Sequence, residues 1–191
     1  SAALSSPGHV IADFSIRKQH IRKHIEKTAY PNQAIINPEL LDEVTALVEW
    51  PVVLKGCFDQ KFLKLPKEVL ITSMQSHQKC FAIENEQGKL LPHFILVSNI
   101  ESKDPQTVIH GNEKVIRARL ADAEFFYQTD CKKPLQDRSK MLEQMLFQQK
   151  LGTLLDKTKR LRKLSSYFSS DSKRAAELCK CDLASNMVYE F

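Results

Sequence analysis

The amino-acid sequence predicts an α+β protein, in which a small mixed sheet with flanking helices is followed by an all-helical domain. Apolar residues recur at helical spacing near the N-terminus, and short apolar runs with strand character lie between residues 50 and 100. Beyond Pro134 only helical periodicity is found. We therefore expect two domains, residues 1–133 and 134–191, with the boundary near Asp130 to Pro134.

Two amphipathic helices are expected before the first strand. The first runs from about residue 12 to residue 28, and Tyr30-Pro31 ends it. The second begins after Asn37, a capping residue that is followed by a proline at the first helical position. The apolar stripe of this second helix consists of Leu40, Leu41, Val44, Leu47 and Val48.

Strands and helices then alternate through the predicted sheet. Strands are expected at residues 50–54, 79–84 and 91–100, and the turn-forming residues 85–88 join the last two. The remaining helices are expected at residues 65–77, 112–128, 135–149, 152–169 and 172–190.

Composition excludes several classes of protein. Of the 191 residues, 42% are hydrophobic and 27% are charged, as in a globular protein that closes a core. Only five glycines are present, and no phosphate-binding loop or dinucleotide fingerprint occurs. No apolar run reaches membrane-spanning length, so we expect a cytoplasmic protein with no membrane partner. The five cysteines lack zinc-ligand spacing and are expected to be free thiols.

The best candidate for a nucleic-acid contact is the basic helix expected over residues 152–169. Lys159, Arg160 and Lys163 project almost opposite its apolar stripe, and such a face can lie along a phosphate backbone. The alternative is a solvated face, partly neutralised by an ion pair between Asp156 and Arg160. The net charge of +5 does not decide between them. The stripe predicted to be buried is Leu151, Leu154, Leu155, Thr158, Leu161, Leu164 and Phe168.

A second group of polar candidates comprises His77, Gln78 and Lys79, at the end of a helix that leads into a strand. These residues either line a pocket for a nucleic acid or an amino-acid-like ligand, or they are structural. Because His77 shares a helical face with Leu70 and Met74, we favour the structural interpretation. His77 is then a hydrogen-bonded core histidine, and Lys79 complements the helix C-terminus.

The helix that opens at Asn112 carries a charged residue inside its expected apolar arc. The arc includes Ile116 and Ala123, and Arg119 falls within it. Burying an unpaired guanidinium is costly, and Asp122 is close enough in sequence to pair with it. We favour an internal Arg119–Asp122 clasp over an Arg119 that faces a cleft and meets a phosphate or a carboxylate.

The sequence shows no catalytic constellation. His20 and His24 are one helical turn apart, which is metal-ligand spacing, but no third ligand lies nearby, so a solvated pair is expected. Ser98 has no base at a suitable spacing. We therefore assign no catalytic residue and no metal ligand to this chain.

The sequence also contains nine short blocks in a characteristic order: 41–51 (LDEVTALVEWP), 65–71 (LPKEVLI), 76–79 (SHQK), 91–94 (LPHF), 98–100 (SNI), 111–113 (GNE), 119–126 (RLADAEFF), 150–153 (KLGT) and 182–191 (DLASNMVYEF). This ordered set resembles the β subunit of the bacterial two-chain glycyl-tRNA synthetase, over about residues 10–191.

The resemblance implies a place in an α2β2 enzyme that joins glycine to tRNA-Gly with ATP and releases AMP and diphosphate. In that family the α chain holds the class II active site and uses the ATP, so no cofactor is expected on this chain. The β chain binds and positions the tRNA. Two other functions stay open, namely an editing hydrolase acting on mischarged tRNA and a structural spacer that holds the α dimer without touching RNA.

The resemblance also implies the origin of both domains. Residues up to about 130 are similar to the editing-type domain in the β chain of phenylalanyl-tRNA synthetase, and residues after about 135 to the truncated start of an HD phosphohydrolase fold. Cys80 departs from the family, which usually has an aromatic residue there. No histidine follows His110, and Cys181-Asp182 is the only candidate for the paired metal position, so metal-dependent phosphohydrolase chemistry is not expected.

Overall fold

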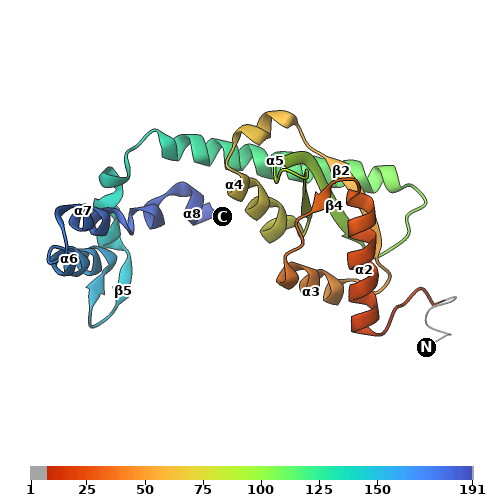
Figure 1. Cartoon of the computed structure of the whole chain (residues 1–191), viewed down its shortest axis with the longest axis horizontal. Coiled ribbons are helices and arrows are strands. Elements are labelled where there is room, and N and C mark those ends of the chain that lie inside the picture. Colours follow the sequence, from red (N-terminus) through yellow and green to blue (C-terminus); the bar gives the residue numbers. More distant parts are fainter. Residues whose placement is uncertain (1–7, 191) are drawn as a thin grey trace. The chain divides into compact units, whose positions relative to one another are not determined.

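Helices flank a small sheet in this protein, which confirms the predicted α+β class. The computed structural model describes residues 8–190 (Figure 1); residues 1–7 and 191, the outer ends of the two predicted domains, lie outside the described part. The chain divides into two compact units, an N-terminal one that ends at Ala123 and a C-terminal one that begins at Glu124. The likeness of residues 1–133 and 134–191 to particular family domains stays a prediction.

The sheet of the N-terminal unit has four strands in the order β1-β3-β4-β2, and every neighbouring pair is antiparallel. The prediction of a mixed sheet is therefore wrong. The helical connection does make β2 and β3 run in the same direction, but β4 inserts between them, so they never pair. The elements of this unit are α2 (Phe14–Ala29), β1 (Gln33–Ala34), α3 (Pro38–Leu47), β2 (Val52–Cys57), η1 (Gln60–Lys64), α4 (Lys67–Thr72), η2 (Ser73–His77), β3 (Phe81–Glu84), β4 (Leu90–Ser98) and most of α5 (Pro105–Cys131).

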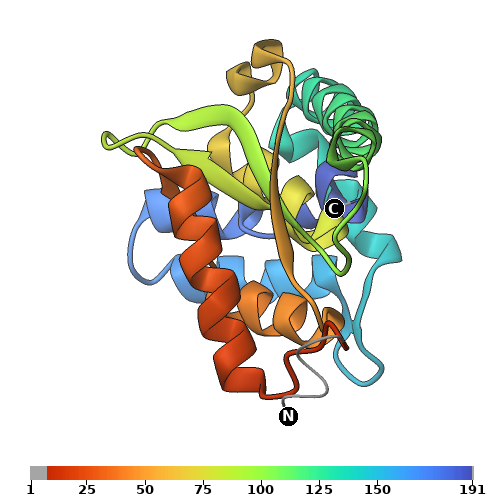
Figure 2. The same ribbon diagram turned by 90° about the vertical axis from the view of Figure 1, so that its right-hand side faces the viewer.

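Helices α2 and α3 cover one face of this sheet. Ile21 and Ile25 of α2 are fully buried in one core cluster with Leu41 of α3 and with Phe81 and Ile95 of the sheet. Each such side chain contributes about 1.5–3 kcal/mol when it leaves water. In Figure 2, α2 and α5 lie on opposite sides of the sheet, so both of its faces are covered.

Helix α5 begins at Pro105, earlier than the sequence predicts. The carboxylate of Asp104 accepts hydrogen bonds from the Thr107 N–H at 3.2 Å and from its hydroxyl at 2.6 Å, and Pro105 suits the first helical position. Further along the helix, Glu113 accepts a hydrogen bond from the Cys57 N–H at 2.9 Å. This bond ties α5 to the end of β2.

A buried arginine joins α2 to α3. Arg17 is 9% exposed, and its Nε donates to the Thr45 carbonyl at 2.9 Å. Its Nη1 donates to the carbonyls of Ile11 and Ala12. Backbone carbonyls thus accept the hydrogen bonds of the buried guanidinium. Helical periodicity alone did not predict that Arg17 is buried.

The C-terminal unit contains a hairpin as well as helices, so the prediction of an all-helical domain is wrong. The helix predicted over 135–149 ends at Gln144, and β5 then pairs with β6 in antiparallel fashion. Gly152 has a φ of +83°, a conformation that favours glycine, and this lets the chain turn back into β6. The elements after α5 are η3 (Leu135–Gln144), β5 (Leu146–Gln148), β6 (Gly152–Thr153), α6 (Leu154–Ser165), α7 (Ser170–Leu178), η4 (Cys181–Ala184) and α8 (Asn186–Glu190).

A buried ion pair holds this unit together. The side chains of Arg138 and Asp130 are 7% and 12% exposed, and Nη1 lies 3.0 Å from Oδ1. Arg138 Nη2 also donates to the Asp130 carbonyl at 2.6 Å. The Asp130 carboxylate further accepts the N–H groups of Asn186 at 3.0 Å and Met187 at 2.8 Å, and so caps α8. The end of α5, η3 and α8 therefore meet at one carboxylate.

Candidate nucleic-acid interface

The start of helix α6 is fixed by a capping box. The Thr153 hydroxyl accepts from the Asp156 N–H at 3.3 Å, and the Asp156 carboxylate accepts from the Thr153 N–H at 3.1 Å. The hydrogen bond from the Thr153 N–H, together with that from its hydroxyl, lowers the pKa of Asp156. A charged carboxylate at the first turn of α6 is favourable for the helix. The basic side chains that follow therefore project from a well-defined helix.

Four basic side chains from α6 and α7 line one surface hollow of about 280 Å³. They are Lys159, Arg162, Lys163 and Lys173, and Ser166 completes the lining. No carboxylate is among these five residues, although Asp156 lies 3.5 Å from Lys159 at the edge. The structure thus brings together two of the three predicted residues, Lys159 and Lys163, and adds Arg162 and Lys173.

Arg160 lies on another face of α6. Its Nη1 donates to the carbonyl of Leu151 at 2.9 Å, and its side chain is exposed. The predicted ion pair between Arg160 and Asp156 is therefore wrong, because the Asp156 carboxylate is held by Thr153 and lies near Lys159. Arg160 still offers a charge at the surface of the same helix.

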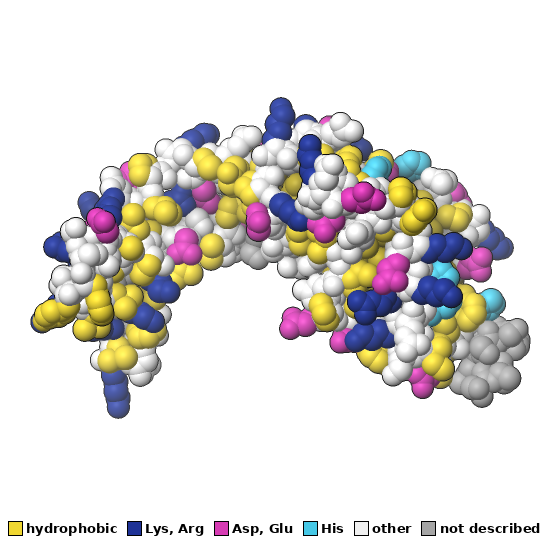
Figure 3. All heavy atoms as spheres, viewed as in Figure 1, with side chains coloured by type: hydrophobic (Ala, Val, Ile, Leu, Met, Phe, Trp, Pro, Cys, Tyr) yellow, Lys and Arg dark blue, Asp and Glu magenta, His cyan; other side chains and the backbone are white. Residues whose placement is uncertain are grey.

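The apolar stripe of α6 is covered only in part. Thr158 is buried, but Leu151, Leu164 and Phe168 are 52%, 61% and 84% exposed. The prediction that these three are buried is wrong because α6 runs only from Leu154 to Ser165. Leu151 and Phe168 therefore lie outside the helix, and Leu164 lies in its last turn. Hydrophobic and basic side chains consequently lie side by side on the surface of this unit (Figure 3).

The polar cluster of the N-terminal unit differs from its prediction. His77 is exposed, so it is not a core histidine. Residues 73–77 form a π-helical turn, which carries more residues per turn than an α-helix and moves His77 away from the face of Leu70 and Met74. Gln78 is half-buried, and Lys79 adopts a φ of +53° and pairs with Glu43 at 2.8 Å.

The Arg119–Asp122 clasp is also wrong. Both side chains are exposed, and within residues 8–190 no ion pair joins them. The buried stripe of α5 is Ile116, Leu120 and Ala123, which is turned about the helix axis from the arc that contained Arg119. Asn112 donates its Nδ2 to the Val108 carbonyl at 2.9 Å, which is a bond within the helix.

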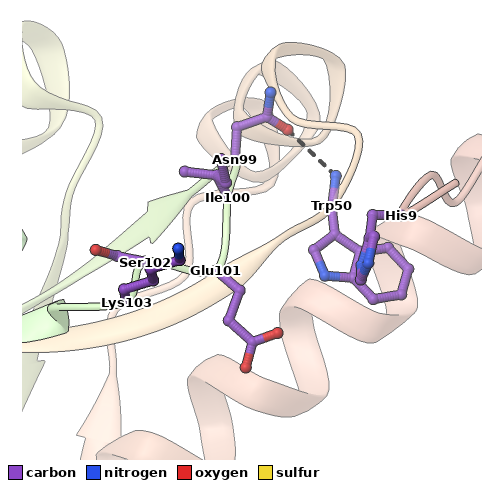
Figure 4. Close-up of a pocket in the computed structure, with 7 residues that line it drawn as sticks. All are labelled: His9, Trp50, Asn99, Ile100, Glu101, Ser102 and Lys103. Atoms are coloured by element: carbon purple, nitrogen blue, oxygen red, sulfur yellow. Dashed lines mark hydrogen bonds between the residues drawn. The ribbon is translucent and has the colours of Figure 1, made fainter. Parts of the chain in front are cut away.

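A larger hollow of about 610 Å³ lies on the N-terminal unit (Figure 4). Its walls are His9, Trp50 and residues 99–103, and the two rings meet edge to face at 4.9 Å. Asn99 Oδ1 accepts the backbone N–H of Trp50 at 3.2 Å, which links the two walls. The Ser102 hydroxyl oxygen accepts from the Asp104 N–H rather than pairing with a base. Sequence patterns did not predict this hollow, since its walls come from separate loops.

Metal ligands are not gathered anywhere in the part of the chain that the structure describes: no group of three or more His, Cys, Asp or Glu residues is placed to hold an ion. The rings of His20 and His24 stack at 4.0 Å, and both are half-buried rather than fully solvated. Burial, followed by the charges of His24 and Lys23, lowers the pKa of His20.

All five cysteines are free thiols. Among residues 8–190, no helix combines the length and the apolar character that crossing a bilayer requires.

Comparison with known proteins adds the family. Residues 1–191 match the family described as "Glycyl-tRNA synthetase beta subunit". Relatives named glycine–tRNA ligase beta subunit include those of Coxiella burnetii (53% identical over 98% of this chain), Chromohalobacter salexigens (52% over 96%) and Vibrio parahaemolyticus (51% over 100%). The chain spans only 28–29% of the length of these relatives.

These matches cover the whole α+β chain and place it in the class of protein families named for aminoacyl-tRNA synthetases. Within that class, the chain belongs to the glycyl-tRNA synthetase beta subunit family.

Proposed function

We propose that this chain is a tRNA-handling part of glycine–tRNA ligase, the enzyme that joins glycine to tRNA-Gly with ATP. In this proposal it helps bind and position tRNA-Gly in the cytoplasm, and an α chain in an α2β2 assembly uses the ATP and performs the chemistry. The beta-subunit names of the relatives imply a partner subunit. The predicted site residues on α6 supply the contact with tRNA.

The observation that carries the proposal is the hollow lined by Lys159, Arg162, Lys163 and Lys173 without a carboxylate. Glu177 pairs with Arg162 and Asp156 lies near Lys159, but Lys163 and Lys173 have no carboxylate partner among the ion pairs of residues 8–190, so the hollow keeps a net positive charge that favours a polyanion. Each phosphate neutralised there releases condensed counterions, which makes the binding strong at low salt. Arg160 is exposed on the same helix, outside the hollow, and extends the contact.

The proposal assigns no chemistry of its own to this chain. Support comes from Ser98 and Ser102, whose hydroxyls hydrogen-bond to backbone groups and are not joined to a base. Glycine-dependent pyrophosphate exchange by the chain without an α subunit should therefore stay at background. Deacylation of alanyl- or seryl-tRNA above background would instead favour the editing hydrolase.

The test of the tRNA contact is a charge-neutralising pair, Lys159→Gln with Lys163→Gln, in the full-length β chain assembled with α. The matched control is Lys132→Gln with Lys133→Gln, which removes the same charge from two exposed lysines of the same unit. Affinity for tRNA-Gly is measured across a salt titration. The α6 pair should lower affinity and flatten the log–log salt slope by about 1.4–1.8, since each lost phosphate contact contributes about 0.7–0.9.

The control pair should change both quantities much less, and melting of the assembly should be the same for both variants. Equal slopes for the α6 pair and the wild type would show that this face is only solvated. The structural-spacer alternative would then stand, because it requires no contact with RNA.

A further inference from the structure

A second cavity adjoins the basic hollow on the C-terminal unit. It measures about 260 Å³ and shares Lys159 and Arg162 with the hollow. The hollow is almost wholly cationic, whereas this second cavity has polar, apolar and charged walls. Its other lining residues are Gln136, Ser139, Leu155, Thr158, Arg174, Glu177 and Leu178.

The two arginines of this cavity are held in place by one carboxylate. Arg162 Nε lies 2.5 Å from Glu177 Oε1, and Arg174 Nη1 lies 3.4 Å from Oε2. Arg174 Nη2 also donates to the Gln136 side-chain carbonyl at 2.6 Å. Fixed guanidinium planes lose little entropy when a ligand binds, and such planes stack well on heterocyclic bases.

The cavity also contains a polar group without a partner. Thr158 is 5% exposed, and its hydroxyl Oγ1 is buried without a hydrogen-bond partner. A threonine in a helix can donate to the carbonyl four residues earlier, and the Thr158 hydroxyl makes no such bond. Leaving a buried hydroxyl unsatisfied costs about 1–3 kcal/mol. A ligand that enters the cavity can remove this cost.

We propose that the cavity takes the base of one unstacked nucleotide, while the phosphates on either side of that nucleotide lie in the basic hollow. The inference rests on the proposed contact of α6 with tRNA, and it specifies that this surface binds an unpaired nucleotide. Leu155 and Leu178 supply apolar contacts to the faces of the base. The Thr158 hydroxyl, the Ser139 hydroxyl and the Gln136 amide are hydrogen-bonding groups for its edge.

Size and charge favour this ligand over a peptide or a duplex. The cavity lies just below the range of roughly 300–1,000 Å³ that small-molecule sites occupy, which suits one base. The cavity and the basic hollow together are lined by five basic side chains and a single carboxylate. The ligand must therefore carry negative charge beside its base, as the phosphates of a nucleotide do. A paired base is stacked inside its helix and cannot enter, whereas the bases of loops and single-stranded ends can.

The experiment compares two RNAs on the full-length β chain assembled with α: a blunt duplex, and the same duplex with a single-stranded 3′ overhang. Thr158→Val removes the hydroxyl and keeps the shape of the side chain. Thr72→Val, at an exposed position of α4, is the matched control. Wild type and control should prefer the overhang RNA, and Thr158→Val should lose about 3–10-fold in affinity for it with no change for the blunt duplex, as one hydrogen bond predicts.

Stability separates this role from a structural one. Because Thr158→Val removes an unsatisfied buried hydroxyl, its melting temperature should equal or exceed that of the wild type, while a defect in folding would lower it and weaken both RNAs. Free adenosine and cytidine monophosphates form a second arm. If they bind and lose affinity in Thr158→Val, the nucleotide can come from solution; if only the overhang responds, it belongs to a strand.

Equal affinities of the wild type for the two RNAs, with Thr158→Val unchanged on both, would overturn the inference. The proposed tRNA contact would survive that result, because its test is the response of tRNA-Gly affinity and of its salt slope to Lys159→Gln with Lys163→Gln.

Discussion

Replacing Arg138 by alanine should destabilise the C-terminal unit strongly. The substitution removes the ion pair to the Asp130 carboxylate at 3.0 Å and the bond to the Asp130 carbonyl at 2.6 Å, both nearly excluded from solvent. Breaking a buried pair by deleting one partner costs about 3–5 kcal/mol, since the other charge stays buried. The N–H groups of Asn186 and Met187 still solvate the carboxylate, so we expect about 3 kcal/mol, the low end of that range.

Native-state hydrogen exchange is the suitable assay, because a chain with two units need not unfold in one step. The Met187 amide, which donates to Asp130 at 2.8 Å, should exchange roughly 100-fold faster in Arg138→Ala, as about 3 kcal/mol implies. Arg119→Ala is the control, because Arg119 is exposed and should change stability by no more than about 0.5 kcal/mol. A slowing or an unchanged rate in Arg138→Ala, or an equal cost in Arg119→Ala, would refute this reasoning.

Three further predictions concern single positions. Gly152→Ala should destabilise α6 by at least about 1–2 kcal/mol in thermal melts, because φ is +83° and a Cβ would lie 2.4 Å from the Asp156 carboxylate. Burial raises the pKa of Asp130, but the hydrogen bonds from Met187 and Asn186 and the charge of Arg138 together outweigh it, so the pKa is lowered. Its stabilisation should therefore be complete above the unfolded pKa of about 3.9 and disappear as pH falls through the lowered folded value, and Asp130→Asn should flatten that acid limb. Burial raises the pKa of the Cys80 thiol to about 12, so thiol reagents should modify it only after unfolding, whereas exposed Cys131 should react in the native protein.

The sequence was most informative where one local signal decided the structure. Asn37 followed by Pro38 predicted the start of α3, and the structure shows the Asn37 side chain accepting the Glu39 N–H at 2.8 Å. The turn before Lys89 likewise predicted the hairpin of β3 and β4, and there the Asn85 side chain accepts the Lys89 N–H at 2.9 Å.

Predictions failed where tertiary contacts decided. Helical spacing predicted an ion pair between Arg119 and Asp122. The structure instead has a buried ion pair between Arg138 and Asp130, which lie on separate elements. Periodicity could not show this, because it reports only neighbours within one helix. The prediction that His77 is buried failed for a local reason, since a π-helical turn is not visible in a pattern that assumes 3.6 residues per turn.

The same limit applies to the candidate site. Periodicity grouped Lys159 with Lys163 because they are one turn apart, and both line the basic hollow. Lys173 comes from the next helix, and the buried Thr158 hydroxyl is recognisable only once its missing partner is seen. Sequence alone therefore identified the helix that carries the candidate residues, but not the concave surface that this helix forms with α7.

The most direct test of the central claim, that the surface of α6 contacts tRNA, is site-specific photo-crosslinking in the assembled enzyme. Lys163 is exposed and lines the basic hollow, so Lys163→p-benzoylphenylalanine places the reactive group there without removing a buried contact. Glu86→p-benzoylphenylalanine, in the exposed turn before β4, is the control. The account predicts a crosslink to tRNA-Gly from position 163 that excess unlabelled tRNA-Gly abolishes, and none from position 86. An enzyme that still charges tRNA-Gly but gives no crosslink from position 163 would contradict it.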